Sequence, residues 1–593
     1  MKKFLFLVLW GLSLVSCNSS VDPLGIISLP PTSMAVANNS LFSIPKSLQV
    51  STTSSNVALD AESLFDWAES QYSLFFSTHE ISQISGVYTF RYYKSTGNYL
   101  GVSNDQVYVL GPMSQGQLMR VGALSDFYCS VISVACKQNS NVNANKPFLG
   151  NVLLGSPTSN SMMVSCLTSG EIGGGYLSWG SSDQVLNSYS YFKYTDSLNP
   201  GIFTISGLEA DKDYYYQFNF LNHTGEWRST PVNKFHTARP PGAPFSFTIQ
   251  ADSHLDGNSD LATYQLTLSN IKNSNSDFHI DLGDTFMTEK FSTPLTNFVS
   301  RAPDFETVNN RYRYERNNYG ALTSSVPLFL VNGNHDGELG WLLDGSPQNN
   351  AVWSTLARQK YFLNPAPSGF YSTDTISDIW TGQRSSWFAW TWGDALFVAL
   401  DPYWNTIKTP TSDPWTQTLG TKQYLWLSDT LKNSTAKYKF IFIHNIIGGL
   451  IGEMRGGIEA APYFEWGGKN LDGTDVFNQK RPGWAMPLHQ LFVKNGVTAV
   501  FHGHDHLYAR QDLDGIVYQE VPQPSAINFS NYNSIASAYS YKAGTILGSS
   551  GFIKVTVGPK SVQAQYIRTW LAKDESSQRK NAEIADVWQA TKP

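Results

Sequence analysis

Cysteine and charge are both scarce in this chain of 593 residues. Only four cysteines are present, so a disulfide-dense scaffold is excluded. Charged residues make up 15%, and acidic residues (47) outnumber basic ones (41), which argues against nucleic acid as a structural partner because such partners usually leave a basic footprint. Low charge with 14% aromatic residues excludes a disordered chain and favours β-rich structure.

Long apolar runs are also missing. The apolar stretch 4–15 follows Lys2 and Lys3, and it is too short to span a bilayer as a lone helix. It ends in Leu14-Val15-Ser16-Cys17, which resembles the lipobox of bacterial lipoproteins, where the signal is cleaved and the cysteine acylated. The alternative is an ordinary signal peptide with a chance cysteine.

We therefore expect residues 1–17 to be a lipoprotein signal peptide. The protein would be an exported lipoprotein of the cell envelope, attached to the membrane through lipidated Cys17. Residues 18–59 are rich in Ser, Asn, Thr and Pro without a sustained apolar period, which predicts a flexible linker.

Residues 60–140 are predicted to form a small α+β module, whose role the sequence does not indicate. Its expected elements are a helix at 61–69 and strands at 88–93 and 107–110. Cys129 and Cys136 would lie about 10 Å apart in a helix, too far for a disulfide, whereas a loop would permit one. The sequence leaves both possibilities open.

Residues 147–240 are predicted to form an all-β sandwich. Strand-like segments at 162–167, 175–180 and 213–220 are separated by Gly, Asn and Ser turns. The Ser-Gly-Leu-Glu-Ala stretch before Tyr214-Tyr215-Tyr216 and the closing Phe-His-Thr resemble the fibronectin type III-like N-terminal domain of purple acid phosphatases. In such a domain Cys166 would be a buried core thiol.

Polar clusters follow five apolar strands in the remaining chain. A helix at 261–272 lies between the first two strands, which predicts a parallel pair. Ligands of open α/β sheets bind at the carboxyl ends of the strands, where all five clusters fall. The strands are 245–250, 278–282, 326–331, 439–443 and 497–501, and the clusters after them are Asp252-Ser253-His254, Gly283-Asp284, Gly333-Asn334-His335-Asp336, His444 and His502-Gly503-His504-Asp505-His506.

These clusters supply Asp, Asn and His side chains without a thiolate, a donor set that suits Zn, Fe, Mn or Ni. Their order resembles the DxH, GD, GNH, H and GHxH pattern of the calcineurin-like metallophosphoesterase superfamily. The resemblance implies an α/β domain over 243–572, a four-layer αββα sandwich. We expect strands at 517–521 and 552–557 to complete its second sheet, and residues 573–593 to be a charged surface tail.

The resemblance also implies two metal ions, of Fe, Zn or Mn, with a hydroxide between them as the nucleophile. One ion would be held by Asp252, His254, Asp284 and His506, and the other by Asp284, Asn334, His444 and His504. His335 would face the leaving group as general acid or charge stabiliser. His502 and His279 have no role in the family pattern, and we interpret them as supporting residues.

The pattern departs from purple acid phosphatases at two positions. Met287 stands where those enzymes have a tyrosine, and His254 is present where they lack the histidine of the DxH motif. The chain therefore resembles the colourless branch of the superfamily in its metal set. Many relatives have a carboxylate at this position that pairs with the catalytic histidine. Met287 cannot do so, and the sequence does not identify the residue that orients His335.

The implied activity is hydrolysis of phosphate monoesters of small molecules. A phosphodiesterase or nucleotidase on the same site is the first alternative, and a surface-binding lipoprotein with a vestigial metal site is the second. Arg455, in a glycine-rich loop, is a candidate for binding phosphate, whereas a structural role is favoured for Arg510. The aromatic stretch 380–392 is more typical of a core than of a base-stacking surface.

Overall fold

The computed structural model describes the strands of the first 145 residues, Phe65, and most of residues 146–592. The gaps after residue 145 are 191–192, 223–225, 288–303, 412, 451–453 and 527–529. The predicted signal peptide lies outside the described residues, as do Cys17, Cys129 and Cys136. Within the part of the chain that is described, no helix is long and apolar enough to cross a membrane.

The chain divides into two compact units. The first comprises residues 1–147, 171–176 and 219–229, and the second comprises 148–170, 177–218 and 230–593.

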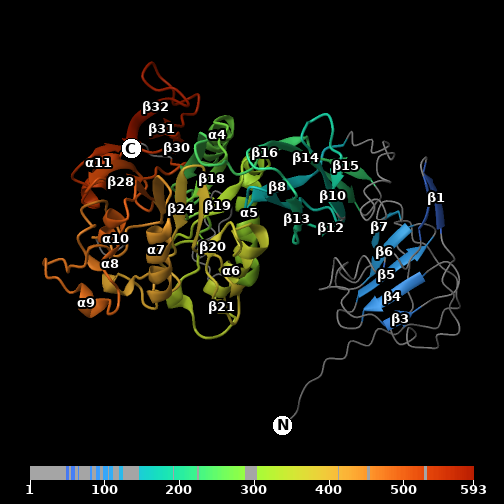
Figure 1. Ribbon diagram of the computed structural model, residues 1–593, viewed down its shortest axis with the longest axis horizontal. Coiled ribbons are helices and arrows are strands. Elements are labelled where there is room, and N and C mark those ends of the chain that lie inside the picture. The colour runs from blue at the N-terminus through green and yellow to red at the C-terminus, as the bar shows by residue number, and fades with distance from the viewer. Residues whose placement is uncertain are drawn as a thin grey trace, which may run out of the picture. The chain divides into compact units, whose positions relative to one another are not determined.

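The first unit contains a five-stranded antiparallel sheet with the order β3-β4-β5-β6-β7 (Figure 1). The strands expected at 88–93 and 107–110 correspond to β4 and β6, but β5 lies between them and pairs with both. The expected linker also contains a hairpin of β1 and β2, so its last residues are not a free tether. The bounds are β1 Leu48–Thr52, β2 Ser55–Leu59, β3 Glu80–Ser82, β4 Thr89–Tyr93, β5 Asn98–Ser103, β6 Gln106–Leu110, β7 Met119–Ala123 and β15 Trp227–Ser229.

The first strands of the second unit are antiparallel. Strands β13, β9 and β8 form one sheet in that order. The three strands expected for the sandwich lie within β9, β10 and β14, and Cys166 on β9 is fully buried and unpaired. The first part of β10 and the last part of β14 belong to the first unit. The bounds are β8 Gly150–Gly155, β9 Ser161–Thr168, β10 Gly173–Gly180, β11 Ser188–Tyr189, β12 Lys193–Thr195, β13 Gly201–Ser206, β14 Asp213–Asn222 and β16 Asn233–His236.

A six-stranded sheet of order β19-β18-β17-β30-β31-β32 follows. Strands β17, β18 and β19 are parallel, as the helix between the first two predicts, and β30 runs antiparallel to β17. The expected tail at 573–593 is wrong in its last part, because β32 pairs with β31 and buries Trp588. The bounds are β17 Phe245–Gln250, α4 Leu261–Asn273, β18 Phe278–Asp281, α5 Phe305–Thr323, β19 Leu328–Leu330, β30 Gly551–Val557, β31 Ser561–Arg568 and β32 Ile584–Thr591.

An eight-stranded sheet has the order β20-β23-β24-β25-β26-β28-β27-β29. The strands expected at 517–521 and 552–557 do not share a sheet, since β28 pairs with β26 here whereas β30 pairs with β17. The bounds are β20 Ser372–Thr373, β23 Phe388–Trp392, β24 Ala395–Ala399, α7 Thr421–Asn433, β25 Tyr438–Phe442, β26 Ala499–His502, β27 Tyr508–Leu513, β28 Ile516–Glu520 and β29 Thr545–Leu547.

Both sheets contribute to one aromatic core. Phe247 and Phe278 of the six-stranded sheet pack against Phe397 of the eight-stranded sheet, with ring centroids 5.0 and 5.2 Å from that of Phe397. Trp390 and Trp392 belong to this core, as expected for the 380–392 stretch. The other face of the eight-stranded sheet is covered by α7, α8 and α10. The bounds of these and the remaining short elements are η4 Gly340–Leu342, α6 Asn350–Tyr361, β21 Ser377–Asp378, β22 Gly382–Gln383, η5 Pro414–Thr416, α8 Phe464–Gly467, α9 Phe477–Lys480, α10 Leu488–Lys494 and α11 Tyr532–Ala538.

Helices α4, α5 and α6 pack together on the six-stranded sheet, and α5 also contacts β8 (Figure 1). Parallel strands of both sheets thus end at the residues that the sequence singled out: β17, β18 and β19 in one sheet, and β25 and β26 in the other. This arrangement allows the five polar clusters to converge.

Candidate metal centre

The predicted ligands lie in turns whose backbone is strained. Five of them have left-handed φ angles, a conformation that costs on the order of 1 kcal/mol or more for a residue with a side chain. Such strain persists only where surrounding contacts hold it, and it concentrates at functional sites. The residues are Asp252 (62°), His254 (45°), Asp284 (54°), His504 (83°) and His506 (58°).

Two glycines let the loops approach closely enough to bring these ligands together. A Cβ atom on Gly333 would lie 2.3 Å from Asp284 Oδ1. A Cβ atom on Gly503 would lie 2.6 Å from Asp252 Oδ2. Both distances are far below van der Waals contact, so the glycines that precede Asn334 and His504 are sterically required.

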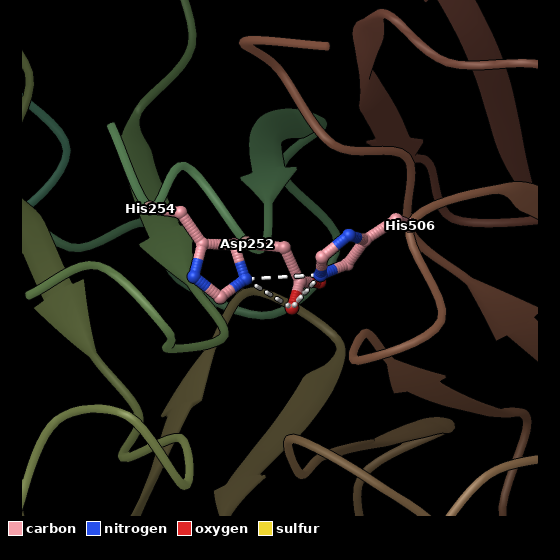
Figure 2. Close-up of side chains that lie close together, drawn as sticks. All are labelled: Asp252, His254 and His506. Atoms are coloured by element: carbon pink, nitrogen blue, oxygen red, sulfur yellow. Dashed lines mark hydrogen bonds and ion pairs between the residues drawn. The ribbon is translucent and has the colours of Figure 1, made fainter. Parts of the chain in front are cut away.

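Asp252, His254 and His506 form the first ligand group (Figure 2). His254 follows β17 and His506 follows β26, and their imidazoles point toward each other with Nε2 atoms 2.9 Å apart. Asp252 Oδ1 lies 3.7 Å from His254 Nε2 and 3.5 Å from His506 Nε2. Three donor atoms from two loops therefore face one point.

Asp284, His444 and His504 form the second group, and all three are buried. His444 Nε2 lies 3.1 Å from Asp284 Oδ2 and 3.2 Å from His504 Nδ1. The other ring nitrogen of His444 donates its hydrogen to the carbonyl oxygen of Leu282 at 2.9 Å. This bond fixes the ring with Nε2 directed at the cluster.

Asp284 links the two groups. Its Oδ2 lies 3.1 Å from His444 Nε2 and 3.7 Å from His254 Nε2. Its Oδ1 accepts a hydrogen bond from the backbone N–H of His335 at 2.7 Å. One carboxylate oxygen is thereby left facing histidines of both groups, the position expected of a bridging ligand.

Two buried oxygen atoms at the centre have no hydrogen-bond donor. Asp252 Oδ1 and Asn334 Oδ1 are both without a partner among the described residues. A buried oxygen left unpaired costs free energy, on the order of 1–3 kcal/mol. A cation held among carboxylate, amide and imidazole donors would satisfy both atoms, so the residues present fit a site for two metal ions.

The electrostatics of the centre favour anionic carboxylates. Burial disfavours the charged form of Asp252, but the neighbouring imidazoles of His254 and His506 hold its pKa below the ordinary value. Burial would likewise lower the pKa of His444, but the charge of Asp284 and their hydrogen bond raise it to about 9. The field of the two carboxylates is thus strong enough to hold a proton on a buried histidine, and the same field attracts a metal ion.

His335 and Arg455 differ in their relation to this centre. The ring of His335 is half-buried, and its centroid lies 5.3 Å from that of His254. The guanidinium of Arg455 donates to the carbonyl oxygen of His504 and lies 4.8 Å above the ring of Tyr539. Arg455 thereby supports the loop that carries two ligands, a contact that the sequence did not predict.

The sequence did not predict the supporting roles of two other residues, because their contacts join distant parts of the chain. Asp336 accepts the backbone N–H groups of Gly333 (2.6 Å) and Thr285 (2.9 Å), which ties the third cluster to the second. Arg311 on α5 donates to the carbonyl oxygen of Phe286 at 2.8 Å, and also to that of His254. Asp336 was visible as a neighbour of His335, whereas no signal in the sequence pointed to Arg311.

The two histidines without a family role are buried, and each has a buried partner of its own. His502 Nδ1 lies 2.6 Å from Glu520 Oε2, and His279 Nδ1 lies 2.9 Å from Thr248 Oγ1. Arg510 pairs with Asp586 of β32 at 3.1 Å. These contacts are those of supporting and structural residues.

The region that contains this centre is similar to known phosphoesterases. Residues 245–508 match the family model of calcineurin-like phosphoesterases, a range that contains every predicted ligand. The solved structure of PhoD is similar over 74% of this chain and 90% of that chain, at 14% identity and a TM-score of 0.51. A purple acid phosphatase from yellow lupin (Lupinus luteus) seeds aligns over 93% of this chain and 89% of that chain, at 12% identity and a TM-score of 0.46. A search of curated protein sequences finds no match.

Proposed function

We propose that this chain is a metal-dependent phosphoesterase that hydrolyses phosphate monoesters of small molecules. The observation that carries the proposal is the position of Asp284 Oδ2, 3.1 Å from His444 Nε2 and 3.7 Å from His254 Nε2. A surface protein with a vestigial site would have no reason to retain every ligand together with the strained turns that present them.

The residues of the centre would divide the work as the resemblance suggests. Asp252, His254, Asp284 and His506 would hold one ion, and Asp284, Asn334, His444 and His504 the other. When bound, two such ions neutralise phosphoryl oxygens and supply an activated water near neutral pH. His335 would donate a proton to the leaving oxygen or stabilise its charge, because its backbone is fixed on Asp284 while its ring remains half-buried.

A two-substrate assay tests the proposal. The purified chain is loaded with Mn, Zn or Fe and assayed with mono- and bis-nitrophenyl phosphate. We expect faster turnover of the monoester and no turnover of either substrate by Asp284→Asn. Asp429→Asn, the same change at an exposed position of α7, serves as the control and should keep wild-type activity.

Other outcomes of this assay would contradict the proposal in distinct ways. Preference for the diester would assign the site to a phosphodiesterase. Inactivity toward both substrates with every metal would favour the vestigial site. Equal activity of Asp284→Asn and wild type would place the chemistry elsewhere.

We further propose the four-layer αββα arrangement for the phosphoesterase domain and a fibronectin type III-like fold for residues 147–240. The core shared by the two sheets and the helices on their outer faces support the first. The antiparallel sheet of β8, β9 and β13 supports the second.

Membrane attachment through Cys17 is also a proposal, supported by the sequence around that residue. Cys17→Ser should release the protein from the membrane fraction or block removal of the signal. Normal processing and retention of the variant in membranes would contradict it.

A further inference from the structure

Met287 contacts the imidazole of His254 on the side away from the centre. Its Sδ atom lies 2.7 Å from His254 Nδ1, and both side chains are buried. A thioether carries no hydrogen to donate, so the ring nitrogen must be the donor. The bond therefore places the proton on Nδ1 and leaves the Nε2 lone pair facing Asp252 and His506.

The acceptor behind a metal-binding histidine influences how strongly the histidine binds. A strong acceptor, such as a carboxylate or carbonyl oxygen, raises the basicity of the ligating nitrogen. His444 of the second group has such an acceptor, the carbonyl oxygen of Leu282 at 2.9 Å. His254 of the first group has only the thioether, which is a weak acceptor.

The first ligand group is also more accessible to solvent than the second. The side chain of His506 is 31% exposed, whereas those of His444 and Asp284 are at most 1% exposed. Among the described residues, none accepts a hydrogen bond from the second ring nitrogen of His506. Water and a competing chelator can therefore reach the first group more easily than the second.

The backbone fixes the sulfur in this position. Asp336 accepts the N–H groups of Thr285 and Phe286 at 2.9 and 3.1 Å. Arg311 donates to the carbonyl oxygen of Phe286 at 2.8 Å. The residue that follows Phe286 is thus held against His254, and a side chain of similar length placed there should reach Nδ1.

We propose that Met287 makes the ion held by Asp252, His254 and His506 the weaker and exchangeable ion of the pair. The inference rests on the proposed two-metal centre and concerns the affinities of its two positions. Met287 is a positioning residue in this role, because it acts through His254.

The test is a chelator titration of zinc-loaded protein, with bound zinc measured by elemental analysis. Wild type should release its two ions in separate steps. Met287→Gln supplies an amide oxygen as acceptor and should raise the affinity of the first-released ion by about 10- to 100-fold, the usual effect of such a partner. Met287→Leu conserves the volume but removes the acceptor, and it should not raise that affinity.

A second variant identifies the position. Asp252→Asn should lose the first step and keep the second step of the wild type. Release of both ions in one step, an unchanged first step in Met287→Gln, or a change confined to the second step would each overturn the inference. Binding of fewer than two ions by wild type would instead overturn the proposed centre itself.

Discussion

At the scale of single residues, five of the seven candidate ligands have a left-handed backbone conformation, which persists only where surrounding contacts hold it. Asp252 and His254 were visible as a cluster after a strand, and the structure brings them together with His506. Their left-handed φ angles could not be read from the sequence, because Asp and His adopt such angles only where tertiary contacts hold them. The contact between Met287 and His254 was likewise hidden, since it depends on how two loops meet.

The centre predicts different effects for His335 and Asp284. His335→Ala should leave about two metal ions per chain but lower kcat by about 10²–10⁴-fold, the usual contribution of a positioned acid. The loss should be smaller for nitrophenyl phosphate, whose leaving group needs little protonation. Asp284→Asn should instead lose metal, because it removes a charge shared by both groups.

Elemental analysis and kcat on a good and a poor leaving group distinguish these roles. Loss of metal in His335→Ala would show that the assignment is wrong. Equal slowing of both substrates would assign His335 to charge stabilisation rather than proton donation.

Glu315 predicts a dependence of stability on pH. Burial raises its pKa from 4.5 to about 7, although Arg311 opposes the shift, and its Oε2 atom has no hydrogen-bond partner among the described residues. Between these values the folded state holds a proton that the unfolded state has lost, so stability falls as pH rises through this window. The cost of ionisation above pH 7 is about 3 kcal/mol.

Glu315→Gln should remove this cost while keeping an acceptor for the hydroxyl of Tyr264, which donates to Glu315 at 2.7 Å. Urea unfolding at pH 5 and pH 8 measures the difference in free energy between variant and wild type. The variant should match wild type near pH 5 and exceed it at pH 8, by up to about 3 kcal/mol. An equal difference at both pH values would mean that Glu315 ionises normally.

At the scale of elements, the sequence analysis did not predict helix α5. Strands β17 and β25 were recognised as short segments rich in apolar residues, each followed by a polar cluster. Helix α5 buries Arg311, Glu315 and Arg316 beside its apolar residues, so charged side chains interrupt the apolar stripe that identifies most surface helices. Its partners lie in distant segments, and the sequence pattern does not contain them.

Arg316 fixes α5 to the strands that precede the phosphoesterase domain. Its guanidinium is fully buried and donates to Asn151 Oδ1 (2.6 Å) and to the hydroxyl (2.9 Å) and carbonyl (2.7 Å) oxygens of Ser165. Burial lowers its pKa to about 10, and the three acceptor atoms named above are all uncharged oxygens. Neutral oxygens therefore stabilise the charge, and the hydrogen bonds to them require the planar guanidinium with its several N–H donors.

Arg316→Lys should destabilise the fold by about 2–4 kcal/mol, because an ammonium group cannot reach all of these acceptors at once. Arg313→Lys, on the same helix but half-buried, should cost less than about 1 kcal/mol. Urea unfolding of the two variants measures both losses. Equal losses would contradict the role of Arg316 in joining the helix to the strands.

At the scale of the whole molecule, the order of the motifs predicted that the polar clusters meet at the ends of parallel strands. It did not predict the order of the strands in the two sheets. The five clusters meet because β17, β18 and β19 are parallel neighbours, as are β25 and β26. The separation of β28 from β30, and the addition of β32 to a sheet edge, depend on pairing between distant segments. Local periodicity contains no information about such partners.

The most direct test of the two-metal centre is anomalous diffraction from crystals of the metal-loaded chain. The account predicts two anomalous peaks about 3.5–4 Å apart, the spacing of a two-metal hydrolase. Asp284 Oδ2 should lie between them, with His254 beside one peak and His444 beside the other. A single peak, or two peaks that do not share Asp284, would contradict the account.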